Sequence, residues 1–212
     1  MIEVKSFTFN PFMENSYVLN DETKECIIID PGCSSTEEEN ILAEYISTNQ
    51  LKPVRLINTH CHIDHIVGNA FVASKYNLNL EAHKLEIPIL ASTEMQAQYF
   101  GFSIQKSPDI SHFIEEGDKI DFGNSSLDTL FTPGHCPGEV SFYNKEQKFI
   151  IGGDVLFQLG IGRTDLPGGD HATLIDSIKN KFFTLEDDCT VYAGHGPSTN
   201  IAFEKANNPF LQ

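Results

Sequence analysis

Short apolar runs of strand length open the chain, and each one ends at a turn signal. Apolar and polar residues alternate over Val4–Phe9, and a second run, Asn15–Asn20, follows a turn that contains Pro11. A third run, Glu25–Asp30, is almost continuously apolar and is closed by Pro31-Gly32. Alternation with a period of two predicts strands with one buried face, and a continuous run bounded by turn residues predicts a buried strand. We therefore expect the chain to begin as a sheet.

Three longer segments change to the helical period. The first is predicted over residues 34–50, where Ser35 and Glu38 match a capping box. Its expected buried face consists of Ile41, Leu42, Tyr45 and Ile46. A second helix is predicted over Lys84–Tyr99 and a third over His171–Phe183. The expected buried face of the third consists of Leu174, Ile175, Ile178 and Phe182.

Four further strand-like runs, at residues 54–58, 126–131, 148–153 and 189–194, stop just before a histidine or an aspartate. The residues that follow them are His60, His135, Asp154 and His195. In α/β proteins functional groups gather where strands end, because the sheet holds the loops rigidly. Ordinary turn residues would explain each case alone, but they explain four matching cases poorly. We therefore assign the chain to the α/β (α+β) class and expect these residues to converge.

Candidate metal ligands are most concentrated in the segment His60-Cys61-His62-Ile63-Asp64-His65. Imidazole nitrogens and carboxylate oxygens bind divalent metals at about 2.0–2.2 Å. Alternate residues of an extended segment share one side, so His60 and His62 are placed to act together. A turn after them would bring Asp64 and His65 to a neighbouring point, as a centre with two ions about 3.5–4 Å apart requires. The alternative is a polar loop that binds metal adventitiously.

Charge and cysteine content narrow the function classes. The formal net charge of −16 argues against broad binding to nucleic acid or to an anionic membrane. The amino terminus does not read as a signal peptide, and no apolar run reaches the length of a membrane span. Five cysteines without a C-x-x-C pair are typical of free thiols, so we expect a cytoplasmic protein. The sequence does not determine the oligomeric state. Cys61 and Cys136 directly follow candidate ligands, and we interpret both as bystanders.

The ordered set THCHIDH, TPGH, GGD and AGHGP resembles the metallo-β-lactamase superfamily, from Val4 to about Phe210. The resemblance implies an αββα four-layer sandwich, in which two mixed sheets are flanked by helices. It implies one domain over residues 1–212. It further implies two divalent metal ions, zinc being expected and iron or manganese the alternatives. The implied ligands are His60, His62 and His135 for one ion and Asp64, His65 and His195 for the other, with Asp154 bridging the two.

Within the superfamily the chain resembles the short bacterial glyoxalase II enzymes, also called hydroxyacylglutathione hydrolases. The supporting segments are Asn15-Ser16-Tyr17, the run that ends at Gly32, residues 160–170 and the final EKANNPF. This resemblance implies hydrolysis of S-lactoylglutathione or a related acyl-thiol by a metal-bridging hydroxide, with Asp64 both orienting the water and binding metal. Because the chain ends at Gln212, the C-terminal helical region that holds glutathione in the long enzymes is not expected.

Substrate contacts and rival functions stay open at this point. Arg163 is a candidate for binding a substrate carboxylate, with an internal ion pair to Asp165 or Asp170 as the alternative. Tyr99 and Phe102 are candidates for lining the approach to the site, with a core role as the alternative. The rival functions are a persulfide dioxygenase with a single iron, a hydrolase of another small ester or phosphoester, a β-lactamase, and a non-enzymatic metal-binding protein.

Overall fold

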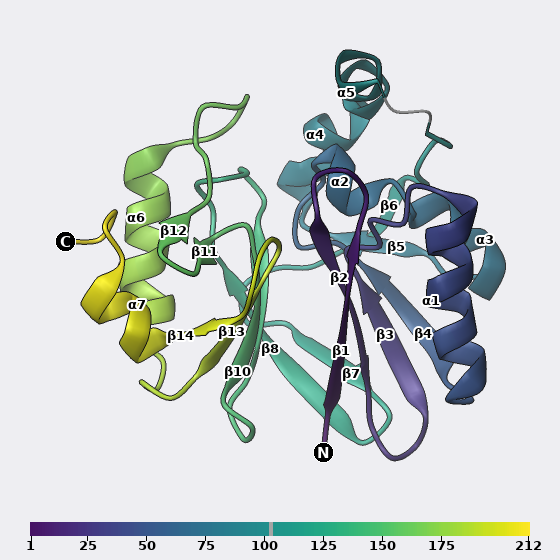
Figure 1. Cartoon of the computed structure of the whole chain (residues 1–212), viewed down its shortest axis with the longest axis horizontal. Coiled ribbons are helices and arrows are strands. Elements are labelled where there is room, and N and C mark those ends of the chain that lie inside the picture. Colours follow the sequence, from purple (N-terminus) through teal and green to yellow (C-terminus); the bar gives the residue numbers. More distant parts are fainter. Residues whose placement is uncertain (102–103) are drawn as a thin grey trace. The chain divides into compact units, whose positions relative to one another are not determined.

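Two six-stranded sheets organise the chain (Figure 1), and each lies mainly in one of two structural units. The computed structural model describes residues 1–101 and 104–212. One unit comprises Met1–Phe113 with Asp121–Ser125, and the other comprises Ile114–Ile120 with Ser126–Gln212. The prediction of one domain over residues 1–212 stays a prediction.

The first sheet has the strand order β1-β2-β3-β4-β5-β6, in which β1, β2 and β3 pair antiparallel and β3 to β6 pair parallel. Its strands are β1 (Glu3–Phe9), β2 (Glu14–Asn20), β3 (Glu25–Ile29), β4 (Lys52–Ile57), β5 (Leu80–Ala82) and β6 (Ile110–Phe113). The helices of this unit are α1 (Thr36–Thr48), α2 (Ile63–Ile66), α3 (Asn69–Tyr76), the short 3-10 helix η1 (Lys84–Glu86), α4 (Ile87–Ala91) and α5 (Thr93–Phe100). The three strands predicted at the start of the chain are confirmed as β1, β2 and β3.

The core of this unit lies between the sheet and two of its helices. The apolar run of β3 is buried along its length, as expected for a strand with neighbours on both sides. Ile28 of β3 and Leu56 of β4 belong to one hydrophobic cluster with Leu42 of α1 and Val72 of α3. Helices α1 and α3 therefore cover a face of this sheet (Figure 1).

Helix α1 begins at the capping residue that the sequence predicts, but its buried face differs from the predicted one. The Ser35 side chain accepts a hydrogen bond from the Glu38 backbone N–H, at 3.3 Å. The Glu38 carboxylate does not complete the box, because it accepts from the backbone N–H groups of Asn10 and Ser34 instead. The expected burial of Ile41 is wrong, since 45% of this side chain is exposed while Leu42 and Ile46 are buried.

The single helix predicted over residues 84–99 is wrong, because the segment divides into η1, α4 and α5. Pro88 lies in the first turn of α4, where its missing N–H costs nothing. Ser92 ends α4, and both its backbone N–H and its hydroxyl donate to the carbonyl of Ile89. A serine that bonds its own backbone in this way competes with helix continuation.

The second sheet has the strand order β14-β13-β10-β9-β8-β7, and a two-stranded sheet pairs β11 with β12. Its strands are β7 (Lys119–Phe122), β8 (Ser125–Phe131), β9 (Val140–Asn144), β10 (Phe149–Gly153), β13 (Thr190–Ala193) and β14 (Thr199–Asn200). The small sheet consists of β11 (Leu156–Phe157) and β12 (Gly160–Ile161). The helices of this unit are α6 (His171–Asn180), the 3-10 helix η2 (Phe182–Thr184) and α7 (Ile201–Asn207).

The helices of the second unit pack on its sheet through one apolar cluster (Figure 1). Leu174 and Ile178 of α6 and Ile201 of α7 are fully buried in a cluster with Ile150 of β10 and Val191 of β13. The predicted fold class is confirmed, since the chain is mixed α/β with two mixed sheets flanked by helices. No helix among the described residues is long and apolar enough to cross a bilayer.

Candidate metal site

In the first unit, the ends of two parallel neighbouring strands bring Asp30 to Thr59. Asp30 follows β3 and Thr59 follows β4, so both lie at the same edge of the sheet. The Thr59 backbone N–H donates to Asp30 Oδ1 at 2.7 Å, and the Thr59 hydroxyl donates to Oδ2 at 2.6 Å. Asp30 adopts a left-handed backbone conformation with φ of 49°, which aspartate tolerates better than most residues. This turn aims its carboxylate at the loop after β4.

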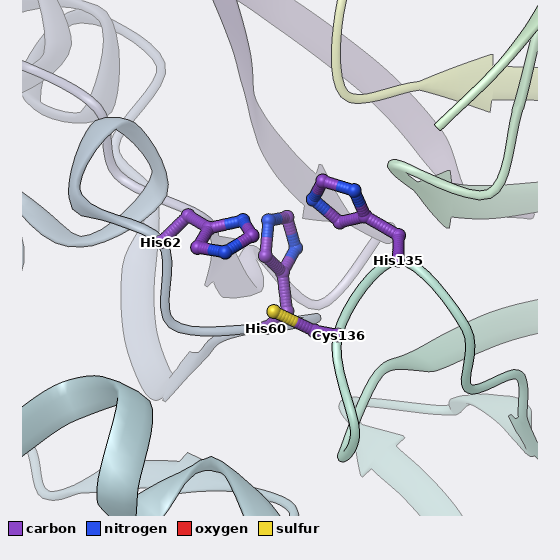
Figure 2. Close-up of side chains that lie close together, drawn as sticks. All are labelled: His60, His62, His135 and Cys136. Atoms are coloured by element: carbon purple, nitrogen blue, oxygen red, sulfur yellow. The ribbon is translucent and has the colours of Figure 1, made fainter. Parts of the chain in front are cut away.

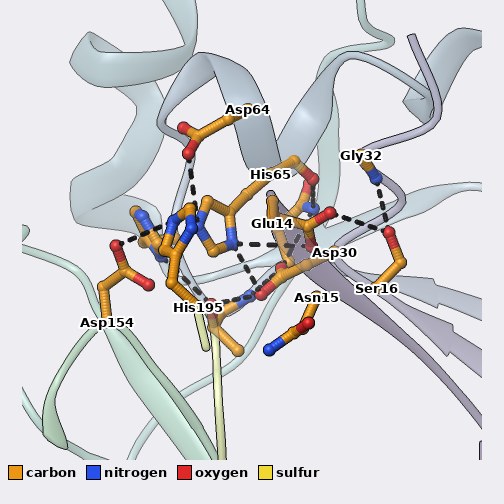
Figure 3. A network of polar contacts seen from close by, with 12 residues as sticks. Glu14, Asn15, Ser16, Asp30, Gly32, Asp64, His65, Asp154 and His195 are labelled. Atoms are coloured by element: carbon orange, nitrogen blue, oxygen red, sulfur yellow. Dashed lines mark hydrogen bonds and ion pairs between the residues drawn. The ribbon is translucent and has the colours of Figure 1, made fainter. Parts of the chain in front are cut away.

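The Asp30 carboxylate determines which ring nitrogens of two histidines can bind metal (Figure 3). Its Oδ2 lies 3.1 Å from His65 Nδ1, so that nitrogen carries the proton and donates it. The Thr59 oxygen lies 3.1 Å from His60 Nδ1, and because the Thr59 hydroxyl already donates to Asp30, it accepts from His60. Both rings therefore keep Nε2 as the nitrogen with a lone pair, which is the arrangement found where a carboxylate orients a metal-bound histidine.

The segment from His60 to His65 is extended first and then turns, as its spacing predicts. His62 has extended backbone angles and precedes α2, the turn that carries Asp64 and His65. The rings of His60 and His62 lie 4.9 Å apart (Figure 2), and those of His60 and His65 lie 4.1 Å apart. The nearest carboxylate oxygen of Asp64 is 3.9 Å from His65 Nε2. All four candidate ligands of this segment thus lie in one small region of the first unit.

Asp30 itself lies within reach of the same region, since ligand atoms of Asp30, His60 and His65 all fall within 4.8 Å of one another. Its oxygens nevertheless accept hydrogen bonds from Asn58, Thr59 and His65. It also faces the protonated Nδ1 nitrogen of His65, so a metal cannot lie between the two. We therefore interpret Asp30 as a residue that positions ligands.

In the second unit, the ends of β8, β10 and β13 bring three candidate ligands together. Strands β10 and β13 are parallel neighbours, and β8 runs in the same direction because it is two antiparallel steps from β10. Asp154 Oδ2 lies 3.5 Å from His135 Nε2. It also lies 3.5 Å from Nε2 of His195, and Figure 3 shows these two residues. Two atoms bound tetrahedrally to a metal at about 2.0–2.1 Å lie about 3.3–3.4 Å apart. The three side chains therefore have the spacing of ligands, with one carboxylate oxygen equally close to two histidines.

His135 is oriented in the same way as His60 and His65. It leaves the loop after β8 next to the buried Cys136 (Figure 2), and its Nδ1 lies 2.7 Å from the carbonyl oxygen of Arg163. The carbonyl can only accept, so Nδ1 carries the proton and Nε2 keeps its lone pair. Gly162 permits this approach, because a Cβ there would lie 1.9 Å from the Asp154 carbonyl oxygen.

Two fully buried glutamates, absent from the sequence interpretation, hold the backbone of the ligand loops. Glu86 Oε2 accepts the backbone N–H of Cys61, between His60 and His62, at 2.8 Å. Glu139 Oε1 accepts the backbone N–H of Asp154 at 2.6 Å. A buried carboxylate that accepts a backbone N–H forms a short, charge-assisted bond. Nothing in the local sequence marks either residue, since each becomes recognisable only through its burial and its partner.

A third buried glutamate, Glu14, lies behind His65 (Figure 3). Burial raises its pKa well above the ordinary value, and the nearby His65 opposes that rise. Glu14 Oε2 accepts from the Ser16 hydroxyl at 2.9 Å, and Ser16 in turn accepts the Gly32 backbone N–H at 2.8 Å. Glu14 thus ties the start of β2 to the turn that follows Asp30.

Comparison with known proteins assigns the family. The sequence pattern of the Metallo-beta-lactamase superfamily matches residues 9–195. The chain belongs to the metallo-beta-lactamase superfamily. The resemblance of its motifs to this superfamily is therefore confirmed.

Within this superfamily, several relatives cover most of the chain. It is 39% identical to the probable metallo-hydrolase YqgX of Bacillus subtilis, over 95% of this chain and 93% of the relative. It is 37% identical to the hydroxyacylglutathione hydrolase GloC of Haemophilus influenzae, over 94% and 93%. It is 33% identical to the mitochondrial persulfide dioxygenase ETHE1 of Bos taurus, over 100% and 74%.

Solved structures of the superfamily match the fold along the chain. BLEG-1, described as a B3 metallo-beta-lactamase, matches with a TM-score of 0.90 and 34% identity, over 100% of both chains. TTHA1623 in a di-iron-bound form matches with a TM-score of 0.88 and 35% identity, over 98% of this chain and 100% of that one. The superfamily assignment and the local geometry agree on metal chemistry at histidine and aspartate side chains.

The three residues predicted to contact substrate have different surroundings in this metallo-beta-lactamase-like chain. The Arg163 guanidinium forms two hydrogen bonds with the Asp165 carboxylate, at 2.7 and 2.8 Å, so the internal pair considered for it is present. Tyr99 is 84% exposed on α5, and Phe102 lies outside the described residues. Burial raises the pKa of the Cys61 thiol well above its ordinary value, which makes it a weak nucleophile. Among the described residues, Cys61 is in none of the groups whose ligand atoms lie within 4.8 Å of one another.

Proposed function

We propose that this protein is a metal-dependent thioester hydrolase of the glyoxalase II type, acting on S-lactoylglutathione or a related acyl-thiol. One observation carries the metal chemistry: Asp154 Oδ2 lies 3.5 Å from Nε2 of both His135 and His195, as a carboxylate shared by two ions requires. The thioester substrate is supported by the 37% identity to hydroxyacylglutathione hydrolase GloC.

The proposed ligand sets combine the candidate ligands of both units. One ion would be held by His60, His62 and His135, the other by Asp64, His65 and His195, and Asp154 would bridge them. The donor set fits, because three of the histidines present a lone-pair Nε2 that a hydrogen bond at Nδ1 has selected. Nitrogen and carboxylate donors suit zinc, and they suit iron and manganese as well. When bound, two such ions lower the pKa of a shared water and polarise the carbonyl of the substrate.

The side chains of the chain itself do the positioning. The Asp64 carboxylate, whose side chain is 15% exposed, accepts a hydrogen bond from the attacking water and orients it toward the carbonyl carbon. The carbonyl carbon gains the water oxygen, the C–S bond breaks, and a carboxylic acid and a thiol leave. Cys61 is not needed as a nucleophile, since its thiol is buried and protonated. Arg163 and Tyr99 are the proposed contacts of the substrate outside the reacting atoms, together with Phe102.

Metal removal tests the proposal directly. We expect the chelator-treated protein to lose hydrolysis of S-D-lactoylglutathione and to recover it with zinc, iron or manganese. We expect two ions per chain by elemental analysis, and a fall toward one in the variant Asp154→Ala. Full activity of the metal-free protein would exclude the proposed mechanism.

A second candidate function is a persulfide dioxygenase, and the 33% identity to bovine ETHE1 over the whole chain favours it. That reaction predicts a single iron and oxygen uptake with glutathione persulfide. Metal stoichiometry and oxygen uptake on the same preparation distinguish the two functions. Two ions without oxygen uptake support the thioesterase, whereas one iron with oxygen uptake supports the dioxygenase.

A further inference from the structure

Exposed apolar side chains from two separate segments of the first unit form one patch. The exposed fractions are 38% for Phe12 and 65% for Met13, at the turn between β1 and β2, and 68%, 84% and 42% for Met95, Tyr99 and Phe100 of α5. The Phe12 ring packs edge-on against the Phe100 ring, with centroids 5.3 Å apart, so the two segments are continuous. We call these five residues the hairpin–α5 patch. Groups of exposed apolar side chains of this kind mark binding surfaces.

Both segments of the patch are attached to the turn that carries Asp64. On the hairpin side, Asn10 Nδ2 donates to the backbone carbonyl of Asp64 at 3.0 Å and to that of Gly32 at 2.9 Å. On the helix side, the Ile63 backbone N–H donates to Gln96 Oε1 at 3.3 Å. The two attachment points are consecutive residues of the metal-binding segment, and Figure 1 shows α2 beside the tip of the β1–β2 hairpin. The patch therefore has a fixed position next to Asp64.

Two residues of the hairpin turn have uncommon backbone conformations. Asn10 and Met13 have left-handed conformations, with φ of 52° and 57°. Asn10 tolerates this region well, whereas Met13 rarely adopts it, and strain of this kind tends to persist at functional positions.

The charge of the patch restricts what can bind there. Neither residues 10–14 nor residues 92–101 include a lysine or an arginine, and the acidic residues of these stretches are Glu14, which is buried, and Glu94. These two stretches therefore contribute no cation of their own to pair with the carboxylates of a glutathione moiety; the lysine that lines a pocket with Thr93 and Glu94 of α5 is Lys106. An uncharged apolar group fits both its surface and its charge.

We propose that the hairpin–α5 patch binds the acyl group of the thioester, so that, among the related acyl-thiols the enzyme hydrolyses, those with long apolar or aromatic acyl groups have a higher kcat/KM than those with a short acyl group. Phe12 and Phe100 would be the specificity-determining residues, with Tyr99 extending the surface. This inference rests on the proposed thioesterase function, because the acyl chain extends from a carbonyl held at the metal-binding segment.

A series of glutathione thioesters tests the inference. With S-acetyl-, S-hexanoyl- and S-benzoylglutathione, we expect kcat/KM to be about tenfold higher for hexanoyl than for acetyl, since four added methylenes are partly covered on an open surface. We expect the gain to appear in KM. A ratio near one, with measurable turnover of each thioester, would overturn the inference and leave the thioesterase proposal standing.

Variants assign the effect to the patch. We expect Phe12→Ser and Phe100→Ser each to lower the hexanoyl-to-acetyl ratio about threefold. Tyr99→Lys should lower the ratio too and should raise the relative rate with S-succinylglutathione, whose acyl carboxylate the new ammonium can pair with. This variant changes an 84% exposed side chain, so it keeps the test valid even if the phenylalanine variants fold poorly. The matched control is Phe113→Ser, a 52% exposed phenylalanine on β6, which should leave the ratio unchanged.

The remaining outcomes separate the possible failures. If no thioester is hydrolysed by fully metal-loaded protein, the proposed function fails and the inference fails with it. If the ratio stays at the wild-type value in all three patch variants, the patch does not bind the acyl group. If Tyr99→Lys converts a dimer to a monomer in sedimentation without changing the ratio, the patch binds a second copy of the chain, and the inference is wrong.

Discussion

Replacing Glu139 tests whether a buried carboxylate outside the ligand set holds the metal centre together. Glu139 is fully buried, and its Oε1 accepts the Asp154 backbone N–H at 2.6 Å. In Glu139→Leu that N–H loses its acceptor inside the protein, at a cost of about 1–3 kcal/mol. If the cost falls on the metal-bound state, it corresponds to about 5- to 150-fold in affinity. Residues that orient metal ligands typically account for about 10- to 100-fold.

We therefore expect Glu139→Leu to bind zinc about 10- to 100-fold more weakly than the wild-type protein, as measured by competition with a chromophoric chelator at pH 7. Glu139→Gln keeps a carbonyl oxygen as acceptor, so its affinity should stay within about fivefold of wild type. The control is Glu116→Leu, which removes an exposed carboxylate that pairs with Lys181 and accepts the backbone N–H of Phe131, a residue that is not a candidate ligand. Equal affinities of Glu139→Leu and wild-type protein would refute the reasoning, as would an equal loss in Glu116→Leu.

Three further variants test other parts of the first unit. Asp30→Asn should weaken zinc binding about 10- to 100-fold, because its single amide oxygen cannot replace both Oδ1, which accepts the Thr59 backbone N–H, and Oδ2, which accepts from His65. Cys61→Ala should keep its full metal content by elemental analysis, because its sulfur is not among the ligand atoms of the described residues that lie within 4.8 Å of one another. Burial alone would raise the pKa of Asp21, but hydrogen bonds from Thr23 and from residues 124 and 125 lower it to about 2. Asp21→Asn should therefore lower the free energy of unfolding in urea by about 1–2 kcal/mol at pH 7.

The sign of the Asp21 effect follows from its lowered pKa. Its stabilisation is present above the unfolded-state value near 3.8 and is lost as the pH falls toward about 2, so the difference between variant and wild type should shrink over that interval. A difference that is constant from pH 7 to pH 2 would contradict this account. Loss of most metal in Cys61→Ala would show that the thiol is a ligand, and unchanged zinc affinity in Asp30→Asn would remove Asp30 from its positioning role.

The sequence alone predicted the elements that carry the candidate ligands. The runs ending near His60, His135, Asp154 and His195 are the strands β4, β8, β10 and β13, and within the second unit three of these residues do come together. Strand direction explains this success, because the carboxyl ends of strands that run the same way lie at one edge. That the ligands of the two units meet around one pair of ions stays a prediction.

What the sequence could not supply depends on contacts between distant residues. Glu86 reaches the Cys61 backbone from 25 positions away, and Glu139 reaches the Asp154 backbone from 15. No periodicity marks either one, because an isolated glutamate is indistinguishable from a surface charge until the fold buries it. The predicted helix over residues 84–99 failed for a local reason, since the hydroxyl of Ser92 bonds the carbonyl of Ile89 and ends α4.

The shared role of Asp30 has a consequence for metal selection. One carboxyl oxygen contacts His65 directly and His60 through Thr59, so both rings are already set in the protein without metal. The free-energy cost of orienting these two rings is therefore met on folding, and metal binding requires little further rearrangement of them. Because nitrogen and carboxylate donors accept several divalent metals, the donor types alone distinguish weakly among them. We expect the metal content of the purified protein to follow the metal supplied in the growth medium, while the fold stays the same.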